Sequence, residues 1–231
     1  MVPYQDEMPK ILFASDLDNT LIYSRRHVLP EEKICVEYYE GHPQSFMTTE
    51  AANILRFMVT EAVFVPLTTR SLAQYGRIEW PSGLAPSLAL VANGAVLLRR
   101  GKVDHKWQAV SRRLVRPYMS ELTAWQNKLT ARFPAQTCRM VDDSYLFLAA
   151  PDESAAQNIA GGIHDSYPLR LARSGRKIYL FPPAMDKGTA LKRLQKIIRP
   201  SLTVAAGDSV IDLPMLRIAD VAIMPPEFPK C

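Results

Sequence analysis

Four short polar stretches, spread over the whole chain, carry the residue types that phosphoryl transfer needs. Three of them directly follow apolar runs typical of β-strands, and the fourth opens an amphipathic stretch. The four are residues 16–20, residues 68–70, Lys187 and residues 207–212. In an open α/β sheet, ligands bind in the crevice beyond the carboxyl ends of the strands. We therefore expect these stretches to meet in one site.

Two aspartates of the first stretch, Asp16 and Asp18, stand two positions apart where a strand turns into a loop. Phosphoryl transfer through a covalent intermediate needs an attacking carboxylate, a cation and a proton donor for the leaving oxygen. We assign Asp16 as the nucleophile and Asp18 as the general acid and then the base, because paired carboxylates with divided roles need different environments. A metal held by Asp16 keeps that residue ionised and leaves Asp18 free to carry a proton. The alternative is that Asp18 belongs to an ordinary turn or helix cap.

Asp208 and Asp212 lie four positions apart, after a turn at Gly207. Their carboxylates predict a site for a hard cation, and Mg²⁺ suits a site with few carboxylates plus water and phosphate. The alternative is a solvated acidic loop in which Asp212 caps the next helix. Together with the two aspartates of the first stretch, they complete the set of metal-binding candidates: Asp16, Asp18, Asp208 and Asp212.

Two further residues are placed to act on a phosphate. Thr68 follows a strand, so its hydroxyl and the neighbouring backbone N–H groups can hold phosphate oxygens, unless it is an ordinary helix cap. Lys187 can neutralise phosphate and orient Asp16 as a point charge, although a lone lysine is usually solvated. Nearby candidates for substrate binding are Thr69, Arg70 and Asn93.

The composition is that of an ordinary globular protein. Of the 231 residues, 48% are hydrophobic and 22% are charged, and the net charge is +5 with the basic residues scattered. We therefore expect a small anionic substrate rather than nucleic acid. Apolar runs stay well short of ~20 residues, and residues 1–7 do not combine a basic region with an apolar core, so we expect neither a membrane span nor a signal peptide. Three widely spaced cysteines indicate reduced thiols, so we expect a cytoplasmic protein without a membrane partner, either a monomer or a weak dimer.

The elements that position the four stretches follow from hydrophobic patterning. Buried strands are predicted for residues 10–15, 62–67, 202–206 and 221–224. Thr48 or Thr49 caps a predicted helix through about Val59, and another helix follows Lys187. Residues 33–47 predict a hairpin around a Gly-His-Pro turn, and we expect this hairpin to form a flap near the site. A second hairpin is predicted at Asn93-Gly94.

The segment between the second and third stretches has a different pattern. A helix over residues 113–131, two strands, a weaker helix over residues 154–164 and a last hairpin predict the order αββαββ. Because it lies between two halves of one site, we expect residues 112–182 to be inserted into a core formed by residues 1–111 and 183–231. The last hairpin has basic residues at its turn. They are candidates for substrate binding, with plain surface charge as the alternative: Arg173, Arg176 and Lys177.

These motifs resemble those of the haloacid dehalogenase superfamily of phosphatases. Residues 16–20 resemble its first motif, Thr68 its second, Lys187 its third and residues 207–212 its fourth. The inserted segment is similar to a small type C2 cap, as in the Cof-like, sucrose-phosphate-phosphatase-like and mannosylglycerate-phosphatase-like branches. Two positions depart from the pattern: Thr69 replaces a usual glycine, and Ile211 replaces a frequent asparagine.

The resemblance implies an α/β fold, in which a Rossmann-like three-layer core with a mostly parallel sheet carries an inserted α+β cap. It implies Mg²⁺ bound by Asp16, the backbone carbonyl of Asp18 and Asp208, with Asp212 binding directly or through another group. It implies hydrolysis of a small phosphorylated metabolite, a sugar or sugar-acid phosphate, through an aspartyl-phosphate. A phosphotransferase or phosphomutase using the same intermediate, and a non-catalytic binder of phosphate ligands, remain as alternatives.

Overall fold

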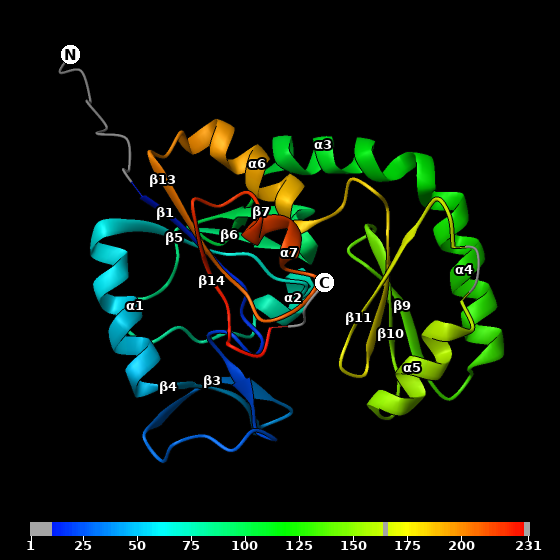
Figure 1. The fold of residues 1–231 in the computed structure, drawn as a ribbon, viewed down its shortest axis with the longest axis horizontal. Coiled ribbons are helices and arrows are strands. Elements are labelled where there is room, and N and C mark those ends of the chain that lie inside the picture. Colours follow the sequence, from blue (N-terminus) through cyan, green and yellow to red (C-terminus); the bar gives the residue numbers. More distant parts are fainter. Residues whose placement is uncertain (1–10, 164–165, 229–231) are drawn as a thin grey trace.

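A parallel sheet forms the centre of the molecule in the computed structural model, which describes residues 11–163 and 166–228 (Figure 1). Its strands lie in the order β14-β13-β1-β5, and all three neighbouring pairs are parallel. They are β1 (Ile11–Ser15), β5 (Ala62–Pro66), β13 (Leu202–Ala206) and β14 (Val221–Ile223). Ser15 is in register with both Pro66 and Ala206, so three strands end at one level. The predicted strands are confirmed; Lys10, the predicted start of the first, lies outside the described residues.

Helices cover both faces of this sheet, as the alternation of side chains in its central strand requires. Leu12 and Ala14 of β1 pack with the helices α3 (His105–Val115), α6 (Lys187–Ile198) and α7 (Leu213–Leu216). Phe13 points to the opposite face, toward α1 (Thr49–Glu61). Thr48 caps α1 by accepting a hydrogen bond from the Ala51 amide, as predicted. The expected three-layer α/β core is therefore confirmed.

A three-stranded antiparallel sheet, which we call the flap, lies beside the carboxyl edge of the central sheet (Figure 1). It consists of β2 (Tyr23–Ser24), β4 (His42–Thr48) and β3 (Lys33–Tyr39). The predicted hairpin is confirmed, but its turn lies at Glu40-Gly41, one step before the expected Gly-His-Pro turn. Both turn residues have positive φ, as a tight hairpin turn requires. Pro43 is the second residue of β4 and lies outside the turn.

A second small sheet extends the core beyond β5. It contains β6 (Leu88–Val91), β7 (Val96–Arg99) and β8 (Lys102–Val103), and the 3₁₀ turn η1 (Ala92–Gly94) joins its first two strands. The hairpin predicted at Asn93-Gly94 is present. Leu90 of β6 bridges to Leu67, which carries the chain from β5 toward the short helix α2 (Leu72–Tyr75).

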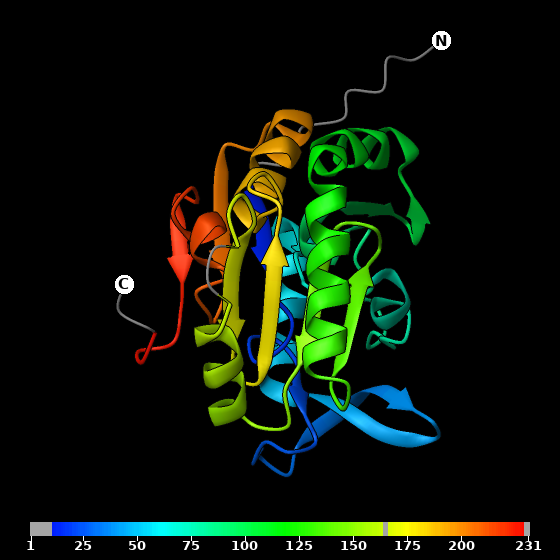
Figure 2. The same cartoon turned by 90° about the vertical axis from the view of Figure 1, so that its right-hand side faces the viewer.

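The inserted unit, α4 to β12, is built around its own antiparallel sheet in the order β11-β12-β10-β9. Its helices α4 and α5 lie on the side of this sheet away from the central sheet (Figures 1 and 2). The elements are α4 (Met119–Arg132), β9 (Thr137–Val141), β10 (Tyr145–Ala149), α5 (Glu153–Gly161), β11 (Arg170–Ser174) and β12 (Lys177–Phe181). The order αββαββ is confirmed, with His164, the predicted end of α5, outside the described residues.

The single helix predicted over residues 113–131 is wrong. The structure has α3 up to Val115, a 3₁₀ turn η2 (Arg116–Tyr118) and then α4 from Met119. Pro117 explains the break, because proline lacks an N–H and its ring clashes with the preceding helical turn. The expected boundary at residue 112 consequently falls inside α3. No helix among the described residues is long and apolar enough to cross a membrane.

Candidate active site

A buried lysine joins two of the predicted stretches. Lys187, the first residue of α6, lies with its Nζ 2.7 Å from Asp16 Oδ1 and 2.5 Å from Asp212 Oδ1. Its side chain is 1% exposed. Burial lowers the pKa of a lysine, but the two carboxylates outweigh this effect and hold the pKa of Lys187 above its usual range. The lysine therefore stays charged and fixes both carboxylates.

The loop after β13 is folded around Asp212. Its Oδ2 accepts hydrogen bonds from the Asp208 amide at 3.2 Å, the Ser209 amide at 2.9 Å and the Ser209 hydroxyl at 2.9 Å. Gly207 makes this approach possible, because a Cβ there would lie 2.5 Å from the Cβ of Asp212. The predicted alternative, in which Asp212 caps the next helix, is not seen: Asp212 precedes α7 but its side chain makes no cap hydrogen bond.

Three carboxylates gather at the carboxyl edge of β1 and β13. Oxygens of Asp16, Asp208 and Asp212 all lie within 4.8 Å of one another. Burial raises the pKa of Asp16 to about 7, and Lys187 opposes this shift while Asp212 adds to it. Burial and then Asp212 also raise the pKa of Asp208. A divalent cation would relieve this repulsion, and an all-oxygen donor set suits Mg²⁺, so these residues fit the metal that the resemblance implies.

Asp18 lies in a different environment. Arg70 binds it in a bidentate manner, with Nη2 2.8 Å from Oδ1 and Nε 3.1 Å from Oδ2. Burial alone raises the pKa of Asp18, but Arg70 outweighs it and holds this pKa below its usual range. The expectation that Asp18 stays free to carry a proton does not describe this state, in which the carboxyl group is ionised and paired.

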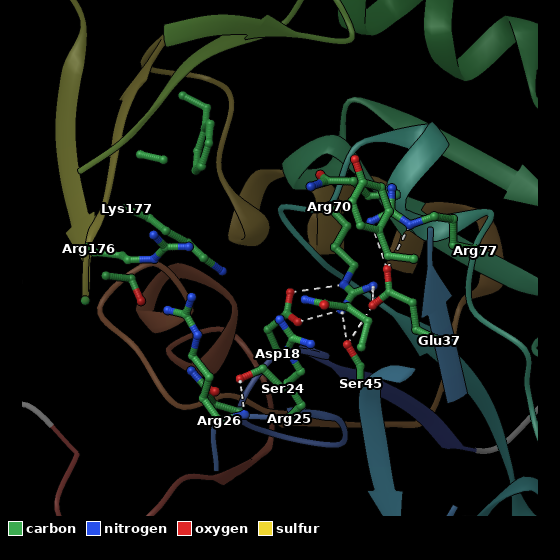
Figure 3. A pocket seen from close by; sticks show the side chains of 18 of the residues that line it. Asp18, Ser24, Arg25, Arg26, Glu37, Ser45, Arg70, Arg77, Arg176 and Lys177 are labelled. Atoms are coloured by element: carbon green, nitrogen blue, oxygen red, sulfur yellow. Dashed lines mark hydrogen bonds and ion pairs between the residues drawn. The ribbon is translucent and has the colours of Figure 1, made fainter. Parts of the chain in front are cut away.

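Glu37 supports Arg70 from the flap, and the sequence did not single it out. Its carboxylate accepts hydrogen bonds from Arg70 Nη1 at 2.9 Å, Arg77 Nε at 2.9 Å and the Ser45 hydroxyl at 2.6 Å. Figure 3 shows this chain of contacts running from Glu37 through Arg70 to Asp18. Burial raises the pKa of Glu37, but the two arginines and the serine lower it overall. Register shifts in β3 around Glu37 turn both Val36 and Glu37 inward, which strand alternation cannot predict.

Thr68, Thr69 and Asn93, all predicted to act on the substrate, lie in different surroundings in the structure. Thr68 is fully buried, and its hydroxyl accepts a hydrogen bond from the Arg70 amide at 3.1 Å. Thr69 lines a small cavity that Asp16, Lys187 and Asp208 also line. Its carbonyl accepts a hydrogen bond from the Tyr145 hydroxyl at 2.5 Å. Asn93 is buried under the loop before α6, where Nδ2 donates to the Met185 carbonyl at 2.9 Å. Asn93 thus holds two loops together and is absent from the lining of that cavity.

The three basic residues predicted at the turn of the last hairpin also line different cavities. Arg176 and Lys177 line a large cavity of about 840 Å³ between the flap and the inserted unit. Lys177 also lines the small cavity next to Asp16 and Lys187. Arg173 pairs instead with Glu153 of α5, at 3.0 Å, and lines a third cavity, which shares Asn19, Ser174, Asp208 and Ser209 with the small one.

Comparisons with known proteins place the fold. No family model matches the chain, and no curated protein matches it in sequence. Among solved structures, the sucrose-phosphatase of Synechocystis sp. PCC6803, determined with sucrose and phosphate, is 18% identical, covers 95% of this chain and 86% of its own, and has a TM-score of 0.61. The IMP-nucleotidase of Plasmodium falciparum is 13% identical over 95% of this chain and 65% of its own, with a TM-score of 0.57.

A third similar structure is the trehalose-6-phosphate phosphatase of Aspergillus fumigatus, which is 12% identical over 97% of this chain and 86% of its own, with a TM-score of 0.52. Two of these three neighbours are named as phosphatases and the other as a nucleotidase. The fold that the motifs implied, an α/β core with a mostly parallel sheet and additional antiparallel sheets, is therefore confirmed.

Proposed function

We propose that this protein is a Mg²⁺-dependent phosphomonoester hydrolase that works through an aspartyl-phosphate on Asp16. The observation that carries the proposal is the placement of Lys187 between Asp16 and Asp212, beside Asp208, at the carboxyl edge of the sheet. The phosphatase fold of the structural neighbours supports it. We propose a phosphorylated sugar or sugar acid as the substrate, in keeping with neighbours whose names include sucrose and trehalose 6-phosphate.

In the first step, an oxygen of Asp16 attacks phosphorus and the bond to the leaving oxygen breaks. Lys187 holds Asp16 in place and offsets the charge of the phosphoryl group. Asp18 gives a proton to the leaving oxygen, then takes one from the water that releases phosphate from Asp16. Asp16, Asp208 and the backbone carbonyl of Asp18 would hold Mg²⁺, which would supply positive charge to offset the charge of the phosphoryl group. Asp212 acts through the loop and the lysine that it holds.

The pairing of Asp18 with Arg70 sets a condition for proton transfer. Arg70 keeps Asp18 ionised in the free protein. A phosphoryl group bound between Asp16 and Asp18 brings negative charge close to this carboxylate, which raises its pKa. We propose that Asp18 takes up its proton on substrate binding, and that Arg70 aims the carboxyl group at the leaving oxygen.

The inserted unit serves as the cap of this site in our proposal, with residues 112–182 as the cap and residues 1–111 and 183–231 as the core. Tyr145 and Asp142 of this unit contact the loop after β5, at the Thr69 carbonyl and the Leu72 amide. Closure of the unit over the small cavity would exclude water and strengthen the electrostatic interactions within it. The free thiols of Cys35 and Cys138 fit the proposed cytoplasmic location.

Removal of the metal is expected to stop the reaction. Phosphate release from p-nitrophenyl phosphate should fall to background in EDTA and return when Mg²⁺ is added in excess. Release of free phosphate, without transfer to an added sugar, separates a hydrolase from a phosphotransferase. Equal activity with and without EDTA would contradict the metal's role.

Asp18→Ala is expected to slow substrates with basic leaving groups more than those with good ones. A general acid typically contributes ~10²–10⁴-fold, and its help matters most when the departing oxygen is strongly basic. The measurement compares kcat/KM for an alkyl phosphate and for p-nitrophenyl phosphate in wild type and variant, because kcat/KM reports the steps up to departure of the leaving group, whereas kcat also includes hydrolysis of the aspartyl-phosphate, which both substrates share. An equal loss on both substrates would assign Asp18 a positional role alone.

A further inference from the structure

The large cavity between the flap and the inserted unit is continuous with the proposed phosphate site. Asp18, Asn19, Ser174 and Lys177 line both this cavity of about 840 Å³ and the small cavity that contains Asp16 and Lys187. A substrate whose phosphoryl group lies at Asp16 therefore extends into the large cavity with the rest of its structure.

The charge of the large cavity is strongly one-sided. Its lining contains two carboxylates, and both are already paired: Asp18 with Arg70, and Glu37 with Arg70 and Arg77. Five further cationic side chains line it. They are Arg25, Arg26, Arg139, Arg176 and Lys177. Within the described parts of the chain, none of these five has a carboxylate within 4.0 Å.

These cations come from elements on opposite sides of the cavity. Arg25 and Arg26 follow β2 on the flap side, whereas Arg139 lies on β9 and Arg176 precedes β12 in the inserted unit. Figure 3 shows Arg25 and Arg26 in the lower part of the view and Arg176 and Lys177 above them at the left. Arg139 is held over the ring of Phe147, at 5.3 Å from its centroid. Scattered surface charge gives no reason for like charges from two separate parts of the fold to line the same cavity.

We propose that this cavity binds a second anionic group of the substrate, so that the preferred substrate is a phosphomonoester carrying a carboxylate or a further phosphate. This inference rests on the proposed function. Like charges brought together repel, and a bound anion offsets that cost. Arginine suits both anions, because its planar guanidinium donates two parallel hydrogen bonds to a carboxylate or a phosphate. An uncharged sugar, such as the remainder of sucrose phosphate, leaves these cations unpaired.

The test compares substrates that differ in the second group. The pairs are glucose 6-phosphate with 6-phosphogluconate, and fructose 6-phosphate with fructose 1,6-bisphosphate, each assayed for phosphate release with Mg²⁺. We expect kcat/KM at least about 10-fold higher for one doubly anionic member, the size of one charge-assisted hydrogen bond. A preference for 6-phosphogluconate identifies a carboxylate as the second group, and a preference for fructose 1,6-bisphosphate identifies a phosphate.

Variants then locate the second subsite. Arg26→Gln, Arg139→Gln and Arg176→Gln should each lower kcat/KM for the preferred doubly anionic substrate by about 10-fold, with less than about a 2-fold change for p-nitrophenyl phosphate. Arg113→Gln is the matched control, because Arg113 is exposed on α3 and absent from the lining of the cavity. Unchanged kcat/KM in all three variants would overturn the proposal.

The two proposals fail in different ways. Hydrolysis of p-nitrophenyl phosphate without any advantage for the doubly anionic substrates overturns the second subsite and leaves the hydrolase intact. Without phosphate release from any substrate, the hydrolase fails, and calorimetric binding of 6-phosphogluconate and glucose 6-phosphate decides the subsite. Equal or absent binding of the two would then refute it, and tighter binding of 6-phosphogluconate that Arg139→Gln removes would support it.

Discussion

Replacing Asp16 with asparagine is expected to abolish turnover while the fold survives. The amide is close in size to the carboxylate, so the packing beside Lys187 is preserved. It carries no negative charge, however, and can neither attack phosphorus nor help to hold Mg²⁺. Loss of a catalytic nucleophile typically lowers kcat by several powers of ten, about 10⁶-fold in a well-studied hydrolase.

The measurement is phosphate release from p-nitrophenyl phosphate, with circular dichroism and the unfolding midpoint recorded on the same preparation. Asp143→Asn is the matched control, because Asp143 is exposed in the turn between β9 and β10 and its positive φ suits asparagine. We expect the control to keep wild-type activity. A folded Asp16→Asn variant with near wild-type kcat would show that another group is the nucleophile.

Lys187→Met is expected to cost both activity and stability. The methionine fills a similar volume but leaves Asp16 and Asp212 without their shared cation in a buried site. Breaking a buried ion pair by removing one partner typically costs about 3–5 kcal/mol. Lys192→Met is the matched control, since Lys192 is exposed on the same helix and should lose little stability. Urea unfolding of the two variants measures the difference.

The stability of the Lys187→Met variant is also expected to depend on pH, in a direction that the pKa of Asp16 determines. Without the lysine, burial and mutual repulsion raise the pKa of Asp16 further above its unfolded value. The folded state then binds more protons than the unfolded state, so the variant's stability should fall as pH rises from about 4, the unfolded pKa, through the folded pKa, which lies above the value of about 7 in the wild type. Mg²⁺ should restore part of the loss at pH 8. A destabilisation that is independent of both pH and Mg²⁺ would contradict the charge argument.

The core could be predicted from the sequence because its strands and the residues that follow them are recognised from short, contiguous stretches of sequence. Apolar runs identify buried strands, and the residue after each run must lie at the carboxyl edge of a parallel sheet. The common register of Ser15 with Pro66 and Ala206 explains why Asp16 and Asp208 come close in the structure. Lys187 was predicted on different grounds, because a lone lysine is usually solvated and its assignment depended on the other three stretches; the structure places it as the first, buried residue of α6.

The network around Arg70 could not be predicted, since it depends on how distant strands meet. Glu37 turns inward only because β3 is irregular there, and it reaches Arg70 across 33 positions of sequence. Hydrophobic patterning gives no sign of such a pairing. Arg25 and Arg26, after β2, were missed for a related reason. They line the large cavity only because the inserted unit lies opposite them. The order of motifs predicts that this unit lies near the site, but it does not predict its orientation.

The central claim is that phosphate passes through a covalent bond to Asp16, and trapping this intermediate tests it most directly. In the Asp18→Ala variant, p-nitrophenol still departs readily, but the water that should attack the aspartyl-phosphate lacks its base. Acid quenching followed by borohydride reduction should therefore convert Asp16, and no other aspartate, to homoserine, as read by peptide mass spectrometry. A variant that releases p-nitrophenol but leaves Asp16 unmodified would contradict the account.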